Sequence, residues 1–190
     1  MNNKLLGWFT AHASLKNIVF AMMAVIPFNA LLFPLLTQRI TTLSGGVETL
    51  DVTLGYLPKT ALQAVEAYTS AGRTWYLITQ WTADLLFPIA YTLLFSLLLA
   101  SLYRRAFSPD SPFQGLRWAP IGMMGFDYLE NITISLLLVS FPQSPMALAV
   151  VASIASLLKW VLAATAGIAL LAGLAALIRN LLPQTEHKGD

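Results

Sequence analysis

Long runs of apolar residues, separated by short polar connections, dominate the chain. Four runs stand out, over residues of about 17–38, 75–103, 118–141 and 145–182. Each meets or exceeds the roughly 20 residues that a helix needs to cross a bilayer. Apolar residues follow one another within these runs, whereas a membrane β-barrel requires alternation. The pattern predicts an all-α membrane protein, a bundle of four transmembrane helices that forms a single domain over residues 1–190.

The first run admits two interpretations. It follows Lys4 and Lys16, as the core of a secretory signal peptide would. It is longer than the usual signal core of about 7–15 residues, and no A-x-A-like site follows it. We therefore interpret it as a membrane helix. Pro27 and Pro34 would remove backbone donors there and are expected to bend the helix.

The fourth run is longer than one crossing requires. As a single helix it would measure about 55 Å, which exceeds the hydrocarbon thickness of roughly 30 Å. We expect it to tilt, to break or to extend beyond the bilayer. Gly167 and Gly173 are the candidate positions for a break, although glycine is common in membrane helices.

The longest connection, residues 39–74, joins the first two runs. Gly45 and Gly46 predict a turn in its first part. Pro58 then opens a pattern rich in Ala, Leu and Glu, which favours a helix. We expect a short interfacial helix here, lying on the outer surface between the first two transmembrane helices and ending near Gly72.

Composition agrees with a membrane protein and removes several classes of function. The chain is 57% hydrophobic and 11% charged, against about 25% charged in a typical soluble domain. It has no cysteine, which excludes disulfides, thiolate metal sites and cysteine catalysis. His12 and His187 lie near the termini, which argues against a histidine zinc site or a Ser-His-Asp triad. No basic run or aromatic-basic stripe supports nucleic-acid binding, and no cofactor is expected.

The distribution of basic residues predicts the orientation. With four crossings, both termini and the connection 103–117 lie on one side of the membrane. That side carries Lys4, Lys16, Arg104, Arg105, Arg117, Arg179 and Lys188, and the other side carries Arg39, Lys59 and Arg73. Because basic residues accumulate on the cytoplasmic side, we expect a multi-pass protein of the cell inner (cytoplasmic) membrane with both termini in the cytoplasm. The tail 183–190 is polar and is expected to be disordered.

Four ionisable residues fall inside the predicted spans, namely Asp84, Asp127, Glu130 and Lys159. A charge at the bilayer centre costs at least about 2.5–3.5 kcal/mol on insertion scales, so these side chains should face one another, a polar cavity or a partner subunit. Asp127 lies three residues before Glu130 and four before Asn131, on one side of a helix. Lys159 lies on a face of small residues, which lets neighbouring helices approach closely.

Two further positions belong to the predicted site. Tyr91 shares a helix face with Asp84 and Pro88, and Asn29 of the first run falls near the level of Glu130. Pro88 is expected to kink the second helix and to free a backbone carbonyl toward the site. The set predicted to bind a ligand or to handle protons is Asp84, Asp127, Glu130, Asn131, Lys159, Tyr91 and Asn29.

Three acids against one base leave two surplus carboxylates in this site. At least one of them must be protonated, bind a cation or contact trapped water. The interpretation we favour is a binding site for a small amphipathic, lipid-like or cationic ligand. A metal is disfavoured because Lys159 would repel it. In arrangement alone, a small bundle with inward carboxylates is similar to four- and five-helix sterol-isomerase-like proteins, and this resemblance assigns no residue here.

Other functions stay open at this point. One is a proton- or ion-coupled transporter or channel subunit, for which four helices would require a homo-oligomer. Another is a non-catalytic accessory or assembly subunit of a larger membrane complex. A third is an architectural role, in which the buried pairs only fix the packing of the helices. An intramembrane enzyme is a further alternative, although no nucleophile–base arrangement in the sequence indicates one. Membrane lipid is an expected partner in each case.

Overall fold

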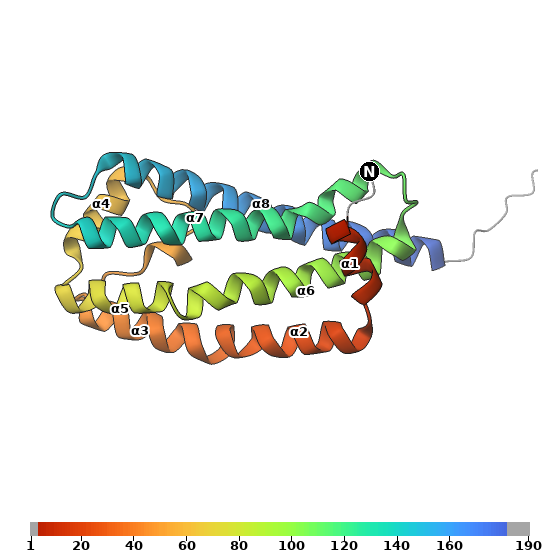
Figure 1. The fold of residues 1–190 in the computed structure, drawn as a ribbon, viewed down its shortest axis with the longest axis horizontal. Coiled ribbons are helices and arrows are strands. Elements are labelled where there is room, and N and C mark those ends of the chain that lie inside the picture. Colours follow the sequence, from red (N-terminus) through yellow and green to blue (C-terminus); the bar gives the residue numbers. More distant parts are fainter. Residues whose placement is uncertain (1–3, 182–190) are drawn as a thin grey trace, which may run out of the picture.

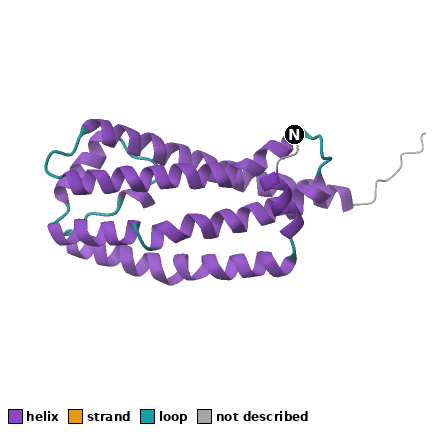
Figure 2. Cartoon of the chain, in the orientation of Figure 1, coloured by secondary structure: helices purple, strands orange, loops and turns teal. Residues whose placement is uncertain are grey.

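The computed structural model describes residues 4–181, and that part of the chain contains helices and loops but no strand. The long helices run side by side, and the loops gather mainly toward the two ends of the bundle (Figures 1 and 2). The elements in chain order are α1 (Lys4–His12), α2 (Leu15–Pro27), the π-helical turn η1 (Phe28–Leu32), α3 (Phe33–Leu43), the 3-10 turn η2 (Leu50–Val52), α4 (Pro58–Ala67), α5 (Ser70–Gln80), α6 (Ala83–Ala106), the 3-10 turn η3 (Pro112–Trp118), α7 (Ala119–Ser140) and α8 (Met146–Leu181).

Three helical stretches are long and apolar enough to cross a membrane. They are Leu15–Leu43, Ser70–Ala106 and Met146–Leu181, and they contain the first, second and most of the fourth predicted runs. The first two are longer than the predicted 17–38 and 75–103. The prediction of an all-helical protein with membrane-spanning segments is therefore supported, in the part of the chain that is described.

Helix α7 is not one of these three stretches. It has 22 residues, which is long enough for a crossing, but its polar residues lower its mean hydropathy. Those residues include Asp127, Glu130 and Asn131, the ones that the sequence assigns to the buried site. The fourth membrane crossing, through α7, therefore stays a prediction.

The first stretch is continuous but distorted between its two prolines. Pro27 closes α2, Pro34 lies in the first turn of α3, and the π-helical turn Phe28–Leu32 joins them. A proline nitrogen has no hydrogen to donate to the carbonyl four residues before it. A wider turn absorbs the missing bonds without ending the helix. The expected distortion is present in this form.

The connection after α3 folds back onto the bundle. Gly45 and Gly46 form the predicted turn, with φ angles of 69° and 99° that favour glycine. The predicted short helix is α4, which packs against α8. Ala61 and Val65 lie one turn apart on its inner face, and both are fully buried.

The end of this short helix differs from the prediction. Helix α4 ends at Ala67, because Tyr68 takes an extended conformation. A new helix, α5, begins at Ser70 with Thr69 as its N-cap, whose side chain accepts a hydrogen bond from the Gly72 N–H at 3.1 Å. Gly72 therefore lies in the first turn of the next helix and does not terminate α4.

The two ends of the bundle hold different connections. Figure 1 places α1, the α6–α7 connection and the last turns of α8 at one end, and α4 with the α7–α8 connection at the other. Helix α8 is unbroken over its 36 residues, so neither Gly167 nor Gly173 interrupts it. The predicted polar tail 183–190 lies outside the described residues.

Gly173 instead permits a close approach of α8 to α6. A Cβ atom at this position would lie 3.0 Å from Tyr103 Cε2 and 3.3 Å from Leu102 Cβ. The Tyr103 ring is not free to move away, because it is fully buried and its hydroxyl donates to the Ala169 carbonyl at 3.1 Å. A Cβ at Gly167 would meet nothing within 4 Å.

This contrast predicts opposite results for the same substitution at two positions of α8. Alanine gains about 1 kcal/mol of helix propensity over glycine, so Gly167→Ala should be neutral or stabilising. Gly173→Ala should lower the stability, because overpacking costs about 1–3 kcal/mol. Thermal unfolding in detergent micelles measures both. An equal or higher unfolding temperature for Gly173→Ala would contradict the close contact.

Candidate functional site

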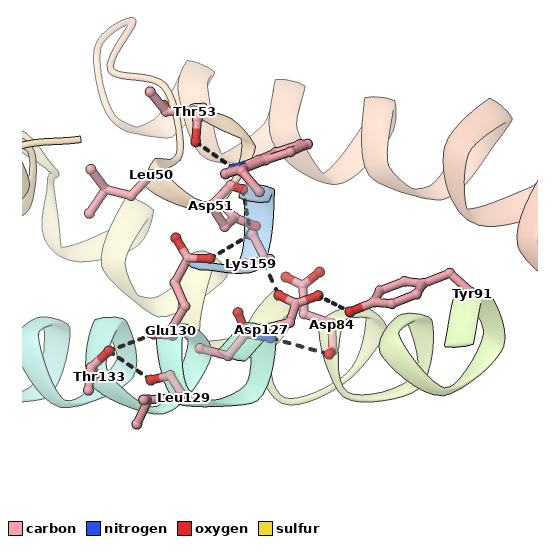
Figure 3. A network of polar contacts seen from close by, with 12 residues as sticks. Leu50, Asp51, Thr53, Asp84, Tyr91, Asp127, Leu129, Glu130, Thr133 and Lys159 are labelled. Atoms are coloured by element: carbon pink, nitrogen blue, oxygen red, sulfur yellow. Dashed lines mark hydrogen bonds and ion pairs between the residues drawn. The ribbon is translucent and has the colours of Figure 1, made fainter. Parts of the chain in front are cut away.

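Lys159 of α8 lies at the centre of a buried group of charged side chains (Figure 3). Its Nζ is 2.5 Å from Glu130 Oε2 and 3.6 Å from Asp127 Oδ1, both on α7. Lys159 is 5% exposed and Glu130 is 0% exposed. Lysine and glutamate are almost never buried to this extent unless they are paired. The structure thus confirms that Lys159 points into the bundle toward the acids of α7.

Helix α6 contributes a second set of polar groups. The Tyr91 hydroxyl donates to Asp127 Oδ2 at 2.9 Å, and Asn131 Nδ2 donates to the main-chain carbonyl of Asp84 at 3.3 Å. Pro88, four residues after Asp84, has no N–H to offer that carbonyl. An amide from α7 takes the place of the missing helical donor. The freed carbonyl that Pro88 predicts is therefore present and is used between helices.

The interruption of this stretch lies before Pro88. Helix α6 continues through Pro88 to Ala106, and the break falls at Trp81 and Thr82, between α5 and α6. Asp84 consequently lies in the first turn of α6 and not in the middle of a continuous helix.

Asp51 completes the group, although it is absent from the predicted set. Its main-chain carbonyl accepts a hydrogen bond from Lys159 Nζ at 3.0 Å, and its Oδ1 accepts one from the Tyr76 hydroxyl at 2.7 Å. The same hydroxyl accepts the N–H groups of Leu50 and Asp51 at 3.0 and 3.2 Å. Asp51 belongs to the polar connection, so its position depends on the folding back of that segment, which no local sequence pattern predicts.

Two tyrosines of the same connection lie near the acids. Burial, followed by the charge of Glu130, raises the pKa of Tyr56 well above its usual range. Burial and then the charge of Asp51 raise the pKa of Tyr68 in the same way, and its hydroxyl donates to the Glu48 carbonyl at 2.6 Å. Both phenols stay protonated at neutral pH, which makes them hydrogen-bond donors and adds no negative charge.

Asn29 does not join the site, so the expectation that the first helix contributes a polar group is wrong. It lies exposed in η1, and its Nδ2 donates to the Val25 carbonyl of its own helix at 3.3 Å. The α2–α3 stretch packs on α6 and α5 through another face, on which Ala21 and Ile40 are buried. Asn29 projects from a different side of the helix than the one that packs on α6 and α5.

We refer to Asp51, Asp84, Asp127, Glu130 and Lys159 as the carboxylate–lysine cluster. The Asp84 carboxylate is within electrostatic range of all four other members. Two buried oxygens in and beside the cluster lack a hydrogen-bond donor among the described residues, namely Asp84 Oδ2 and Asn131 Oδ1. The Glu130 carboxylate, by contrast, interacts with Lys159, Tyr56 and Ser156. Buried acceptors are normally paired. A group with N–H or O–H donors that is not part of this chain would satisfy them.

Within residues 4–181, no three His, Asp or Glu side chains are arranged to hold a metal ion. Comparison with family models, with curated proteins and with solved structures finds no match for this chain. The functional interpretation therefore rests on the geometry of the cluster.

Removal of the base tests the cluster as a unit. Lys159→Met leaves Glu130 and Asp127 buried without a counter-charge and should lower the free energy of unfolding by about 3–5 kcal/mol. A second substitution, Glu130→Gln, should recover part of this loss, because the paired residues are coupled. Reversible unfolding in mixed detergent micelles measures the double-mutant cycle. Lys59→Met, at an exposed position of α4, is the matched control, and equal effects of the two lysine substitutions would refute the buried pair.

Proposed function

We propose that this chain is a polytopic inner-membrane protein with four crossings, and that its carboxylate–lysine cluster binds the cationic head group of a small amphipathic molecule. The observation that carries the proposal is the surplus of buried acid. Four carboxylates of the described residues surround one lysine, and one of them, Asp84, retains a buried oxygen without a donor among those residues.

The path of the chain supports the fourth crossing. The α6–α7 connection lies at one end of the bundle and the α7–α8 connection at the opposite end (Figure 1). If α6 and α8 cross the membrane, α7 must run from one side to the other between them. Its 22 residues give a length of about 33 Å, which matches the hydrocarbon thickness. Its polar side chains are tolerated because they face α6 and α8.

The basic residues support the orientation. Arg104 and Arg105 end α6, Arg117 lies in η3 and Arg179 lies in the last turn of α8. All four are therefore at the end of the bundle that also holds α1. The preference of basic residues for the cytoplasmic side favours a cytoplasmic location for this end.

The charge of the cluster supports a cationic head group. An ammonium group brings N–H donors for the unpaired oxygens and a positive charge for the surplus carboxylates, and hydrogen bonds of this charge-assisted kind are the strong ones. A carboxylate head group would add to the negative charge. The apolar outer faces of the bundle helices provide the surroundings that the chain of an amphiphile requires.

Proton transfer is the second candidate, and it rests on the continuity of the contacts. Tyr91, Asp127, Lys159 and Glu130 form an unbroken series in which each group contacts the next. Such a series of ionisable groups inside a membrane is typical of proton relays. Proton flux into liposomes that contain the protein, together with its loss in Asp127→Asn, would favour this candidate over ligand binding.

A series of single-chain probes tests the leading proposal. Calorimetric titration of the protein in lipid nanodiscs should show saturable binding of dodecylammonium and none of dodecanoate. Asp84→Asn should weaken dodecylammonium binding about tenfold or more, because it removes a charged acceptor. The matched control is Glu66→Gln, at an exposed acid of α4. Equal affinity of Asp84→Asn and wild type, or only the heat seen with empty nanodiscs, would reject a cation site.

A further inference from the structure

A second feature lies at the end of α6 that is remote from the carboxylate–lysine cluster. Asp84 is in the first turn of α6, whereas Arg104 and Arg105 are in its last turn, about 30 Å further along the helix axis. A cavity of about 470 Å³ is formed there by the end of α6 and the corner at which α1 meets α2. The α6–α7 connection lies at the same end of the bundle (Figure 1). The cavity is therefore separate from the cluster.

The lining of this cavity carries positive charge and no negative charge. Arg104 and Arg105 line it, no acidic side chain does, and both polar and apolar atoms are open to it. Both arginines are exposed, and neither guanidinium has an ion pair, hydrogen bond or ring contact with a described residue. The sequence has no acid before Glu48 and none between Asp84 and Asp110. The guanidinium donors are thus available to a ligand.

The start of α2 adds backbone donors beside the two arginines. Ser14 lines the cavity and caps this helix, because its hydroxyl accepts the Asn17 N–H at 3.3 Å and its carbonyl accepts the Ile18 N–H at 3.0 Å. The N–H groups of Leu15 and Lys16 come before these two and have no acceptor within the helix. The positive end of the helix dipole also favours an anion. The corner therefore strengthens the attraction for negative charge.

The rest of the lining is mostly apolar and includes Ala11, Ala13, Leu15 and Ile18. If the apolar stretch Ser70–Ala106 crosses the membrane, its last turn lies at the boundary between the bilayer and water, where basic residues are common. The volume of the cavity falls within the usual range of roughly 300–1,000 Å³ for small-molecule sites. A ligand at this place meets cationic donors and apolar atoms together.

We propose that this cavity binds the phosphate group of an anionic phosphoester, either the head group of an acidic phospholipid or a free phosphate ester at the membrane surface. Guanidinium groups bind phosphate through paired N–H···O bonds, and charge-assisted bonds of this kind are the strong ones. Basic pockets at the cytoplasmic ends of membrane helices bind lipid head groups in the same way. The apolar lining favours the lipid, and that source rests on the membrane crossing of α6 that we propose.

Native mass spectrometry of the full chain in a nonionic detergent tests the site with two lipids of equal chain length. Phosphatidylglycerol should be retained at about tenfold lower concentration than phosphatidylcholine, whose choline group neutralises the phosphate charge. An excess of glycerol 3-phosphate distinguishes the two sources. A lipid site keeps its phosphatidylglycerol, because the soluble ester lacks the apolar contacts, whereas a site for a free ester binds glycerol 3-phosphate and releases the lipid.

Two variants connect the retention to the arginines and to the space. Arg104→Gln combined with Arg105→Gln should weaken phosphatidylglycerol binding about tenfold or more. The matched control, Arg179→Gln, removes an exposed arginine from the last turn of α8 outside the cavity and should leave the binding unchanged. Since loss of basic residues can also impair membrane insertion, a second variant keeps both arginines. Ala11→Trp fills the cavity from an exposed position of α1 and should abolish the preference for phosphatidylglycerol.

Equal retention of the two lipids, an equal loss in Arg179→Gln and in the double variant, or an unchanged preference in Ala11→Trp would overturn the proposal. Only a general attraction between basic residues and acidic lipid would then remain. Asp84→Asn separates this site from the carboxylate–lysine cluster. It should weaken dodecylammonium binding and leave phosphatidylglycerol retention intact, so either proposal can fail without the other.

Discussion

The ion pair between Lys159 and Glu130 is the interaction on which the rest of this structure depends. Two charges withdrawn from water lose several kilocalories per mole of hydration each, and only close contact and additional hydrogen bonds offset that loss. Here the contact is 2.5 Å, and Asp127 and the Asp51 carbonyl add further partners for the ammonium group. The three helices α6, α7 and α8 must therefore keep one register relative to one another, or the charges would face lipid.

The polar connection between α3 and α4 covers the part of α8 that carries Lys159 and Trp160. Tyr76 holds η2 through three hydrogen bonds, and Trp160 donates to the Thr53 carbonyl at 2.9 Å. The loop thus lies over Lys159 and limits its access to water (Figure 3). Low polarity around the cluster strengthens its internal contacts and at the same time raises the cost of each unpaired oxygen. The loop therefore keeps the cluster, with its four carboxylates and one lysine, away from water.

The helices and the pairing of Lys159 with Asp127 and Glu130 could be predicted from the sequence, because both follow from local rules. Continuous apolar runs require helices in lipid, and charges in such runs require partners. The role of Asp51 could not be predicted, since the loop places it by long-range folding. The position of Asn29 in the chain predicts its depth but not the side on which it projects. The break before Asp84 is marked by no glycine or proline. Hydropathy alone does not identify α7 as a membrane-spanning helix, because the polar residues that form the site also lower its mean hydropathy.

A density map of the protein in lipid nanodiscs, at a resolution that shows side chains, would test the buried ion pair. We expect Lys159 in contact with both Glu130 and Asp127, the loop at Asp51 closed over it, and non-protein density against the unpaired oxygen of Asp84. A map in which Lys159 points to lipid, or in which the acids are separated and each faces bulk water, would contradict it.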